Sequence, residues 1–448
     1  MVRKALVIAA LCAATFNSYP VFANDDIDAL KRQLATMKQN YETRLYALEI
    51  GLKQAQLKAN LANVKSNQVE KAMVEAKSNS PRSTQNSFNP AISLILDGRY
   101  ASYSNNPDDY ALAGFALGEE AGLDQSGFSV GESEITLSST IDDKFYGQMT
   151  LAFSDEGVEV EEIFFQTLGL SDGLTVKGGR FFSGIGYLNQ QHAHAWEFAD
   201  APLIYRGLFG NQLSNDGLQV TYLMPTDTFF QVGGEVGNGT NYPSSGSNSG
   251  VGSWSVFTNI GDDIGIESSW QLGLSHWEAN HIKGRESQYL GDSFAFDGDG
   301  EINGLSFVYK WAPRGNPKNR NFMLQYEYFQ RDEKGVVASD LFSSSYRGEQ
   351  SGWYTQAIYQ FSPVWRTGLR FDRLSSDNSG NDLMALNTVG LLDNGHHPER
   401  LSAMLEWIPS EFSRIRLQAN HDNSTKKSDN QLLLQYTFSL GSHGAHQY

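Results

Sequence analysis

The last strand-like stretch of the chain, 428–440, alternates between apolar and polar residues. Leu432, Leu434, Tyr436, Phe438 and Leu440 share one parity, and the residues between them are mostly polar. Because successive side chains of a strand point to opposite faces, this pattern predicts a strand with one apolar and one polar face. Half-buried strands of soluble sandwiches alternate in the same way, so this stretch alone leaves the fold class open.

The same alternation recurs in about sixteen segments between residue 90 and the C-terminus. This number is even and lies within the range of strand numbers found in bacterial outer-membrane barrels. Tight, turn-rich links such as Ile141–Asp143, Ser171–Gly173 and Pro409–Glu411 alternate with long connections. The long connections are 104–126, 183–213, 238–250, 279–298, 332–349 and 377–397. This sorting of loops by parity predicts an all-β transmembrane antiparallel β-barrel, closed so that every backbone group is paired in lipid.

Residue parity also assigns a face to each side chain. In the segment 350–362, Tyr359 and Phe361 share one parity, and Gln356 and Gln360 share the other. We expect the apolar set to face lipid and the polar set to face a water-filled interior. The segment Val158–Gln166 breaks this phase at Glu161–Glu162, which predicts a β-bulge there.

The N-terminus has the pattern of a secretory signal peptide over residues 1–23. Arg3 and Lys4 precede the apolar run Ala5–Phe16, and Ala23 lies at the expected cleavage point. The one cysteine, Cys12, falls inside this segment, so we expect a mature chain without disulfides or thiolate metal sites. The formal net charge of −17 argues against a nucleic-acid partner.

Residues 24–77 predict an α-helical coiled coil in the periplasm. Apolar residues follow a heptad spacing that breaks once, by a four-residue stutter between Tyr41 and Leu45. Such a helix has no core of its own, so we expect segment 25–77 to join copies of the chain into a homo-oligomer, with a trimer as the expected state. A loose helical spacer is the alternative. The polar segment 78–89 predicts a linker, which leaves 90–448 as the barrel.

Two motifs carry a resemblance to a known family. They are Leu174-Thr-Val-Lys-Gly-Gly-Arg-Phe-Phe-Ser-Gly-Ile-Gly-Tyr187, which continues to Arg206, and Ser439-Leu-Gly-Ser-His-Gly-Ala-His446. The first resembles the place where a strand of phosphate-selective porins O and P enters the infolded third loop. Both resemble a subgroup often labelled zinc-regulated outer-membrane receptors. The resemblance implies a sixteen-stranded, often trimeric channel, although the dense Arg and Lys ladder of a phosphate-selective pore is absent from this sequence.

Segment 183–213 is the candidate for a constriction, because it is the longest connection and is rich in glycine and aromatic residues. A loop of this composition can fold inward, and selectivity then arises where loop and wall approach each other. The candidate lining residues of the loop are Tyr187, Trp196, Glu197 and Asp200. Those of the wall are Arg99, Glu132, Glu134, Arg366, Arg370, Arg414 and Arg416. We expect a basic stripe opposite an acidic side, and ordinary solvated lumen charges are the alternative.

His192 and His194 are the candidate metal ligands. Their i, i+2 spacing puts both imidazoles on one side of an extended segment, near Glu197 and Asp200, and these residue types suit zinc. Structural hydrogen bonding by the two histidines is the alternative. No other cofactor is expected.

These features predict an outer-membrane porin of a Gram-negative bacterium that passes small hydrophilic solutes or ions by passive diffusion through a pore narrowed by loop 183–213. The alternative is a metal-responsive, zinc-binding uptake protein that uses His192 and His194. The expected partners are outer-membrane lipid, the barrel-assembly machinery acting on the C-terminal strand 428–448, and the solutes themselves. No paired nucleophile and base stands out, so an enzyme is not expected.

Overall fold

The computed structural model describes residues 90–118, 121–154, 157–245, 250–290 and 292–441. The chain divides into two units, 1–85 and 86–448, and the described residues belong to the second. The expected signal peptide 1–23, coiled coil 24–77 and linker 78–89 lie outside the described residues, as does the C-terminal end 442–448.

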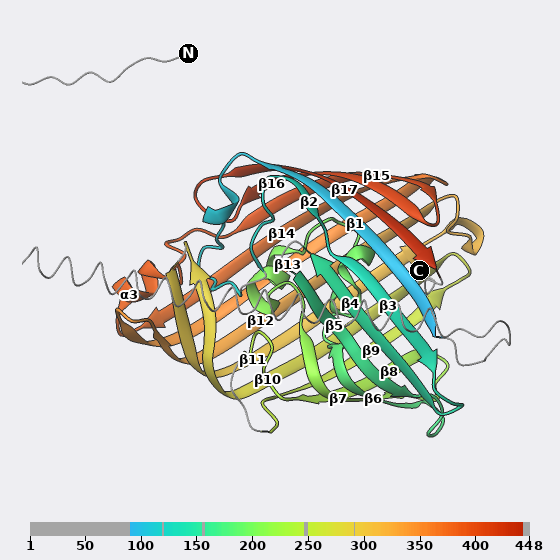
Figure 1. Ribbon diagram of the computed structural model, residues 1–448, viewed down its shortest axis with the longest axis horizontal. Coiled ribbons are helices and arrows are strands. Elements are labelled where there is room, and N and C mark those ends of the chain that lie inside the picture. Colours follow the sequence, from blue (N-terminus) through green and yellow to red (C-terminus); the bar gives the residue numbers. More distant parts are fainter. Residues whose placement is uncertain (1–89, 119–120, 155–156, 246–249, 291, 442–448) are drawn as a thin grey trace, which may run out of the picture. The chain divides into compact units, whose positions relative to one another are not determined.

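The described residues form one antiparallel sheet that closes on itself (Figure 1). Its strands are β1 (Ala91–Tyr103), β2 (Gly127–Val130), β3 (Ser133–Thr140), β4 (Phe145–Ser154), β5 (Gly157–Thr167), β6 (Leu174–Phe182), β7 (Ser214–Leu223), β8 (Phe229–Gly237), β9 (Ser253–Ile264), β10 (Ser268–Tyr289), β11 (Asp292–Trp311), β12 (Asn321–Ala338), β13 (Ser343–Ser362), β14 (Trp365–Gly380), β15 (Glu399–Ser410), β16 (Ser413–Asn423) and β17 (Asp429–Gly441). The helical turns are η1 (Pro107–Asp109), η3 (Leu188–Gln190), η4 (Ala193–Ala195), α2 (Leu203–Phe209), η5 (Pro313–Gly315) and α3 (Leu383–Thr388).

Closure is made by β1, which pairs with β17 on one edge, from Ser93 opposite Gly441 to Tyr103 opposite Gln431. On its other edge β1 pairs with both β2 and β3. These two short strands share one place in the ring, so the seventeen strands form a barrel of sixteen positions. This confirms the sequence-based prediction of a closed antiparallel barrel of sixteen strands.

Long and short connections alternate around part of the barrel, but four connections on the long side are short: those between β4 and β5, β10 and β11, β12 and β13, and β16 and β17. The expected loops 279–298 and 332–349 are mostly strand, because β10 runs to Tyr289 and β12 to Ala338. The prediction of loops there was wrong for a physical reason. Both stretches carry exposed charged residues on their outward parity and buried apolar residues, such as Phe296 and Val337, on their inward parity, which reverses the apolar-out, polar-in pattern of a lipid-facing strand. Strands β10–β13 are therefore 18 to 22 residues long, against 9 or 10 for β4, β6 and β8.

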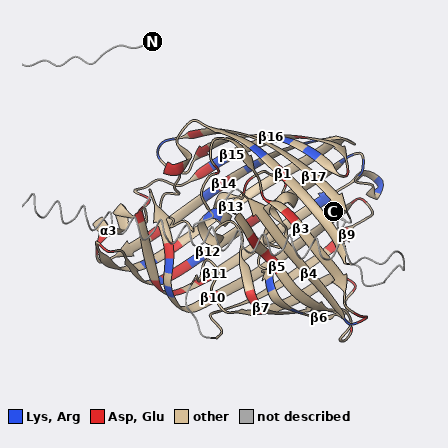
Figure 2. Ribbon diagram, in the orientation of Figure 1, with Lys and Arg blue, Asp and Glu red and all other residues tan. Residues whose placement is uncertain are grey.

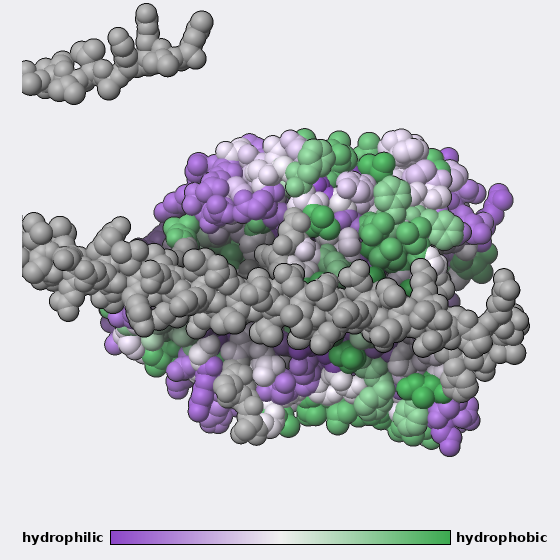
Figure 3. All heavy atoms as spheres, in the orientation of Figure 1, coloured by the Kyte–Doolittle hydropathy of each residue, from purple (hydrophilic) through white to green (hydrophobic). Residues whose placement is uncertain are grey.

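The two faces of the wall differ as parity predicts. On β13, Gln356 and Gln360 are buried inside the barrel, whereas Tyr359 and Phe361 are exposed on the outside. Figure 3 shows apolar residues gathered on the outer surface between more hydrophilic ends. The register shifts where Thr150 faces Glu162 and Leu151 faces Val160, so Glu161 is the extra residue of a bulge. In the part of the chain that is described, no helix is long and apolar enough to cross a membrane.

Part of the interior is a hydrophobic core rather than open space. It combines apolar residues of segments 104–126 and 183–213 with inward-facing residues of β10–β14. Phe115 and Phe209 come from the segments, and Trp277, Phe329 and Leu374 come from the wall. This core fills the side of the barrel that carries the long strands.

Candidate functional site: the inner loop and its cavities

The connection 183–213 between β6 and β7 lies inside the barrel (Figure 1). Its helix α2 is buried at every residue and contacts β12, β13 and β14. The helix ends at Gly210, whose φ of 63° is in the left-handed region that glycine adopts at helix ends. The loop is therefore an internal element with its own helical turns.

Two buried wall carboxylates hold the first part of this inner loop. Glu235 on β8 accepts hydrogen bonds from the hydroxyl of Ser183 at 2.6 Å and the N–H of Gly184 at 2.7 Å. Glu327 on β12 accepts one from the N–H of Tyr187 at 2.6 Å. Each carboxylate is at most 3% exposed, so each depends on the loop for part of its hydrogen bonding.

The middle of the inner loop is held by ion pairs to the opposite wall. Asp200 contacts Arg370 at 2.5 Å and Arg400 at 2.9 Å, and Glu197 contacts Arg366 at 2.7 Å. Burial alone would raise the pKa of Asp200, but the two arginines lower it well below its usual range. These contacts join residues about 170 to 200 positions apart in the sequence.

The remaining arginines of the expected basic stripe differ in their contacts. Arg416 donates to the carbonyl of Trp196 at 2.8 Å and pairs with Glu406 at 2.6 Å. Arg414 reaches Thr437, with a Nε–Oγ1 distance of 3.4 Å. In Figure 2 the basic residues of β14–β16 and the acidic residues of β3 and β5 lie on different parts of the wall.

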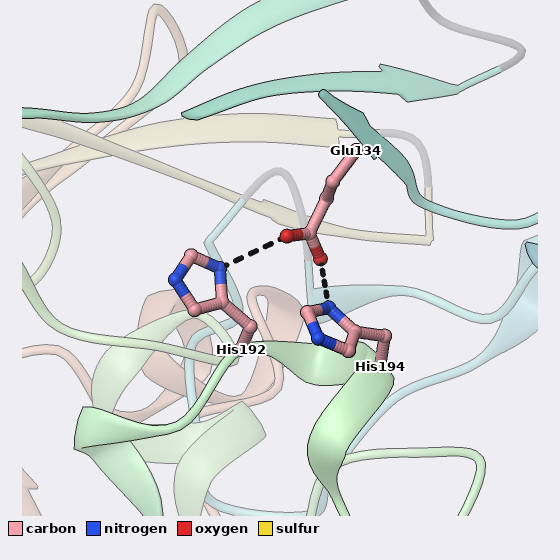
Figure 4. Close-up of side chains that lie close together, drawn as sticks. All are labelled: Glu134, His192 and His194. Atoms are coloured by element: carbon pink, nitrogen blue, oxygen red, sulfur yellow. Dashed lines mark hydrogen bonds and ion pairs between the residues drawn. The ribbon is translucent and has the colours of Figure 1, made fainter. Parts of the chain in front are cut away.

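The two histidines of the inner loop contact one buried carboxylate (Figure 4). Glu134 on β3 bonds His192 through one oxygen at 3.2 Å and His194 through the other at 2.5 Å, in both cases at Nδ1. One possible ligand atom from each residue, an imidazole nitrogen or a carboxylate oxygen, lies within 4.8 Å of the other two. Glu134 is 1% exposed and His194 is 8% exposed.

Two further carboxylates, both on β5, surround His192. Glu161 contacts Nδ1 at 3.0 Å, and Glu162 contacts Nε2 at 3.1 Å. Burial alone would lower the pKa of His192, but Glu161 and Glu134 raise it well above its ordinary value. The arrangement can therefore hold a charged imidazolium, or it can offer nitrogen and oxygen ligands to a metal ion.

Two cavities lie beside the inner loop. The larger has a volume of about 890 Å³ and is lined by residues of the loop, of β1 and β5, and of segment 104–126. The smaller has a volume of about 420 Å³ and is lined by Tyr187 and by residues near the short turns, including Asp263 and Lys310.

The site residues predicted from the sequence differ in whether they line one of these two cavities. Arg99, Glu132, Trp196 and Asp200 line the larger cavity, and Tyr187 lines the smaller. Glu134, Glu197, Arg366, Arg370, Arg414 and Arg416 line neither of these two cavities. Glu134 meets the histidines, and Arg366, Arg370 and Arg416 meet the loop.

Sequence reasoning did not find several residues that shape this site: Glu161, Glu162, Glu235, Glu327, Asp372, Arg400 and Glu406. Six of them share one signal, which is a charge on the inward parity of a strand, and Glu161 is the bulge residue. Parity could have identified the six, but not the loop residues they contact.

No family model matches the sequence. Among solved structures, the chain is similar to the outer membrane channel DcaP of Acinetobacter baumannii, with 11% identity, a TM-score of 0.47, and coverage of 78% of this chain and 97% of that chain. It is also similar to Pseudomonas putida OprB, with 14% identity, a TM-score of 0.48, and coverage of 79% and 94%. These TM-scores are below 0.5, and nothing about the function of this chain follows from them.

A sequence relative is closer. An uncharacterized protein of Aquifex aeolicus (strain VF5) is 30% identical to this chain in an alignment of 400 residues, and the match covers 82% of this chain and 81% of the relative. At this identity and coverage, the chain belongs to the same protein family as the Aquifex protein.

Proposed function

We propose that the protein is an outer-membrane porin of a Gram-negative bacterium, through which small hydrophilic solutes or ions diffuse passively. Three features support the proposal: the closed sheet, the apolar side chains on its outside, and the polar side chains that alternate with them on its inside. A closed antiparallel barrel with this pattern satisfies its backbone hydrogen bonds in lipid. The long connections would face outward and the short turns would face the periplasm.

The observation that carries the proposal is the inner loop. It lies inside the barrel, is held by wall residues from β3 to β16, and leaves a cavity of about 890 Å³ on the β1–β5 side. Loop 183–213 would narrow the pore, and Trp196 is one of the large side chains through which the loop lines this cavity. The side of the barrel filled by the hydrophobic core would carry no solute.

Single-channel recording in planar bilayers tests the proposal. The purified protein should form steady open channels, and Trp196→Ala should raise their conductance because it removes a large side chain from the cavity lining. Trp407→Ala is the matched control, because Trp407 is exposed on the outer surface and its loss should leave the conductance unchanged. Absence of channels, or a mature protein that is folded and monodisperse without detergent, would contradict the proposal.

We also propose that the protein assembles as a homo-oligomer, a trimer, through segment 25–77, and that strand 428–448 is read by the barrel-assembly machinery. The heptad spacing supports the first statement and the aromatic-rich final strand supports the second. Removing 25–77 should convert the oligomer to monomers, as measured by light scattering in detergent. An unchanged mass would show that the barrel itself holds the copies together.

A second candidate function is a zinc-responsive binding or uptake protein. The observation that favours it is the joint contact of Glu134 with His192 and His194, with Glu161 beside them. The same contacts also describe a hydrogen-bonded clamp between loop and wall. Elemental analysis of chelator-treated, zinc-reloaded protein separates these readings, because only a metal site retains one zinc per chain.

The double variant His192→Asn, His194→Asn should lose that zinc. His276→Asn is the control, since His276 faces Glu278 elsewhere on the barrel, with a distance of 3.8 Å. If the conductance is the same with and without zinc, passive diffusion stands as the function even if the metal binds.

A further inference from the structure

We infer that the passage prefers cations to anions. The inference rests on the proposed porin function and adds the class of ion that the passage favours. It follows from the charges that line the two cavities and from the contacts that already occupy the nearby arginines.

The larger cavity is lined by twice as many acidic as basic residues. The acidic residues are Asp124, Glu132, Glu159, Glu161, Asp200 and Glu286, and the basic residues are Arg99, Arg180 and Arg206. The formal charge of the lining is therefore −6 + 3 = −3, with histidine counted as neutral.

The arginines of this lining already have partners. Arg99 lies 3.3 Å from Asp97 and 3.2 Å from Asp124, and Arg180 lies 2.6 Å from Asp216. The guanidinium of Arg206 donates to the carbonyls of residues 121 and 122. An anion in the cavity would have to compete with these contacts for each positive charge.

Two of the acidic residues differ from the arginines in this respect. Within the described residues, Glu159 and Glu286 form no ion pair, and both are exposed. Their charge stays available to a mobile ion. A cavity lined by one excess sign of charge raises the local concentration of the opposite ion.

The wall arginines of β14–β16 do not reverse this balance. Arg366, Arg370 and Arg416 each pair with a carboxylate of the loop or the wall, so they contribute little free positive charge to the passage. Arg414 contacts Thr437 instead of a carboxylate, but neither cavity includes any of these four arginines in its lining.

The smaller cavity, near the short turns, also has more acidic than basic residues in its lining. Asp227, Asp262 and Asp263 line it together with one lysine, Lys310. Its formal charge is −3 + 1 = −2. Both cavities beside the inner loop are thus acidic, and a cation meets attraction on both sides of the loop.

The test is the reversal potential of single channels in a tenfold KCl gradient with about 0.1 M salt on the dilute side, where charges are screened over about 10 Å. The wild-type channel should pass K⁺ at least about twice as readily as Cl⁻, because the excess charge is only partly screened. The double variant Glu159→Gln, Glu286→Gln should shift the permeability ratio toward one, because it removes two exposed charges of the lining. Glu349→Gln is the control, because Glu349 is exposed on β13 outside both cavities, and it should keep the wild-type ratio.

The outcomes are separable. Channels that prefer K⁺ and lose this preference in the double variant support the inference. Channels that prefer Cl⁻, show no preference, or keep the wild-type ratio in the double variant overturn it and leave the porin function standing. Protein that inserts into the bilayer but never conducts overturns the porin function, and the cation preference falls with it.

Discussion

At the scale of single residues, Asp200 has the densest set of partners in the inner loop. Its carboxylate accepts from Arg370, Arg400, Gln418 and Asn420. Two fully buried guanidiniums share this carboxylate and that of Asp372 on β14, so Asp200 links loop and wall more strongly than a surface ion pair would.

The variant Asp200→Asn should therefore be strongly destabilised. It leaves Arg370 and Arg400 with Asp372 as their one remaining carboxylate in a buried site, and breaking a buried pair costs about 3–5 kcal/mol. The loss should appear as a lower midpoint of unfolding by urea in detergent. Asp377→Asn, at an exposed position of β14, is the control and should stay close to wild type. Equal midpoints for all three proteins would show that the loop is held by its other contacts.

At the scale of elements, the inner loop behaves as a part of the barrel rather than as a surface loop. Glu235 holds its start, Glu327 its first turn, and Asp200 its middle. Because the contacts are spread over the wall, release of one should open one part of the loop and leave the rest in place.

Glu327→Ala should expose the part of the loop near Tyr187 to proteases. The change leaves the half-buried N–H of Tyr187 and the buried hydroxyl of Tyr205 without this acceptor, at a cost of about 1–3 kcal/mol. That cost corresponds to about 5- to 150-fold faster cleavage through local opening. Limited proteolysis of detergent-solubilised protein measures the rate. Glu301→Ala, exposed on β11, should be cut like wild type. Faster cleavage in both variants would point to general loss of stability instead.

The elements also show what sequence can and cannot supply. Alternation identified the barrel, and a break in its phase located the bulge at Glu161, because both depend only on neighbours in the chain. The added lengths of β10–β13 were missed because their apolar residues, such as Phe296 and Val337, lie on the inward parity, the reverse of the pattern in the lipid-facing wall. The pairing of Asp200 with Arg400 was missed as well, since nothing local links two residues 200 positions apart.

At the scale of the whole molecule, the barrel depends on the meeting of its first and last strands. Gly98 on β1 lies opposite Tyr436 on β17, and a Cβ at Gly98 would lie 2.0 Å from the Tyr436 ring. Only the absence of a side chain lets that ring cover the seam.

Gly98→Val should consequently weaken closure by about 1–3 kcal/mol, the usual cost of overpacking. The expected result is loss of the compact, heat-sensitive band in unboiled gel samples. Tyr436→Ala in the same chain should restore the band by making room for the added side chain. If Tyr436→Ala does not restore the band, the loss of closure in Gly98→Val comes from the backbone of β1 and not from a clash with the Tyr436 ring.

The unequal height of the wall has a consequence for what reaches the protein from outside. A strand needs about 9–11 residues to cross the hydrocarbon core, and β10 has 22. In a membrane-embedded barrel, half of β10 and similar parts of β11–β13 therefore stand clear of the bilayer as a screen on one flank. Large objects such as antibodies or phage tails would touch this screen first, while small molecules approach the mouth from the lower flank.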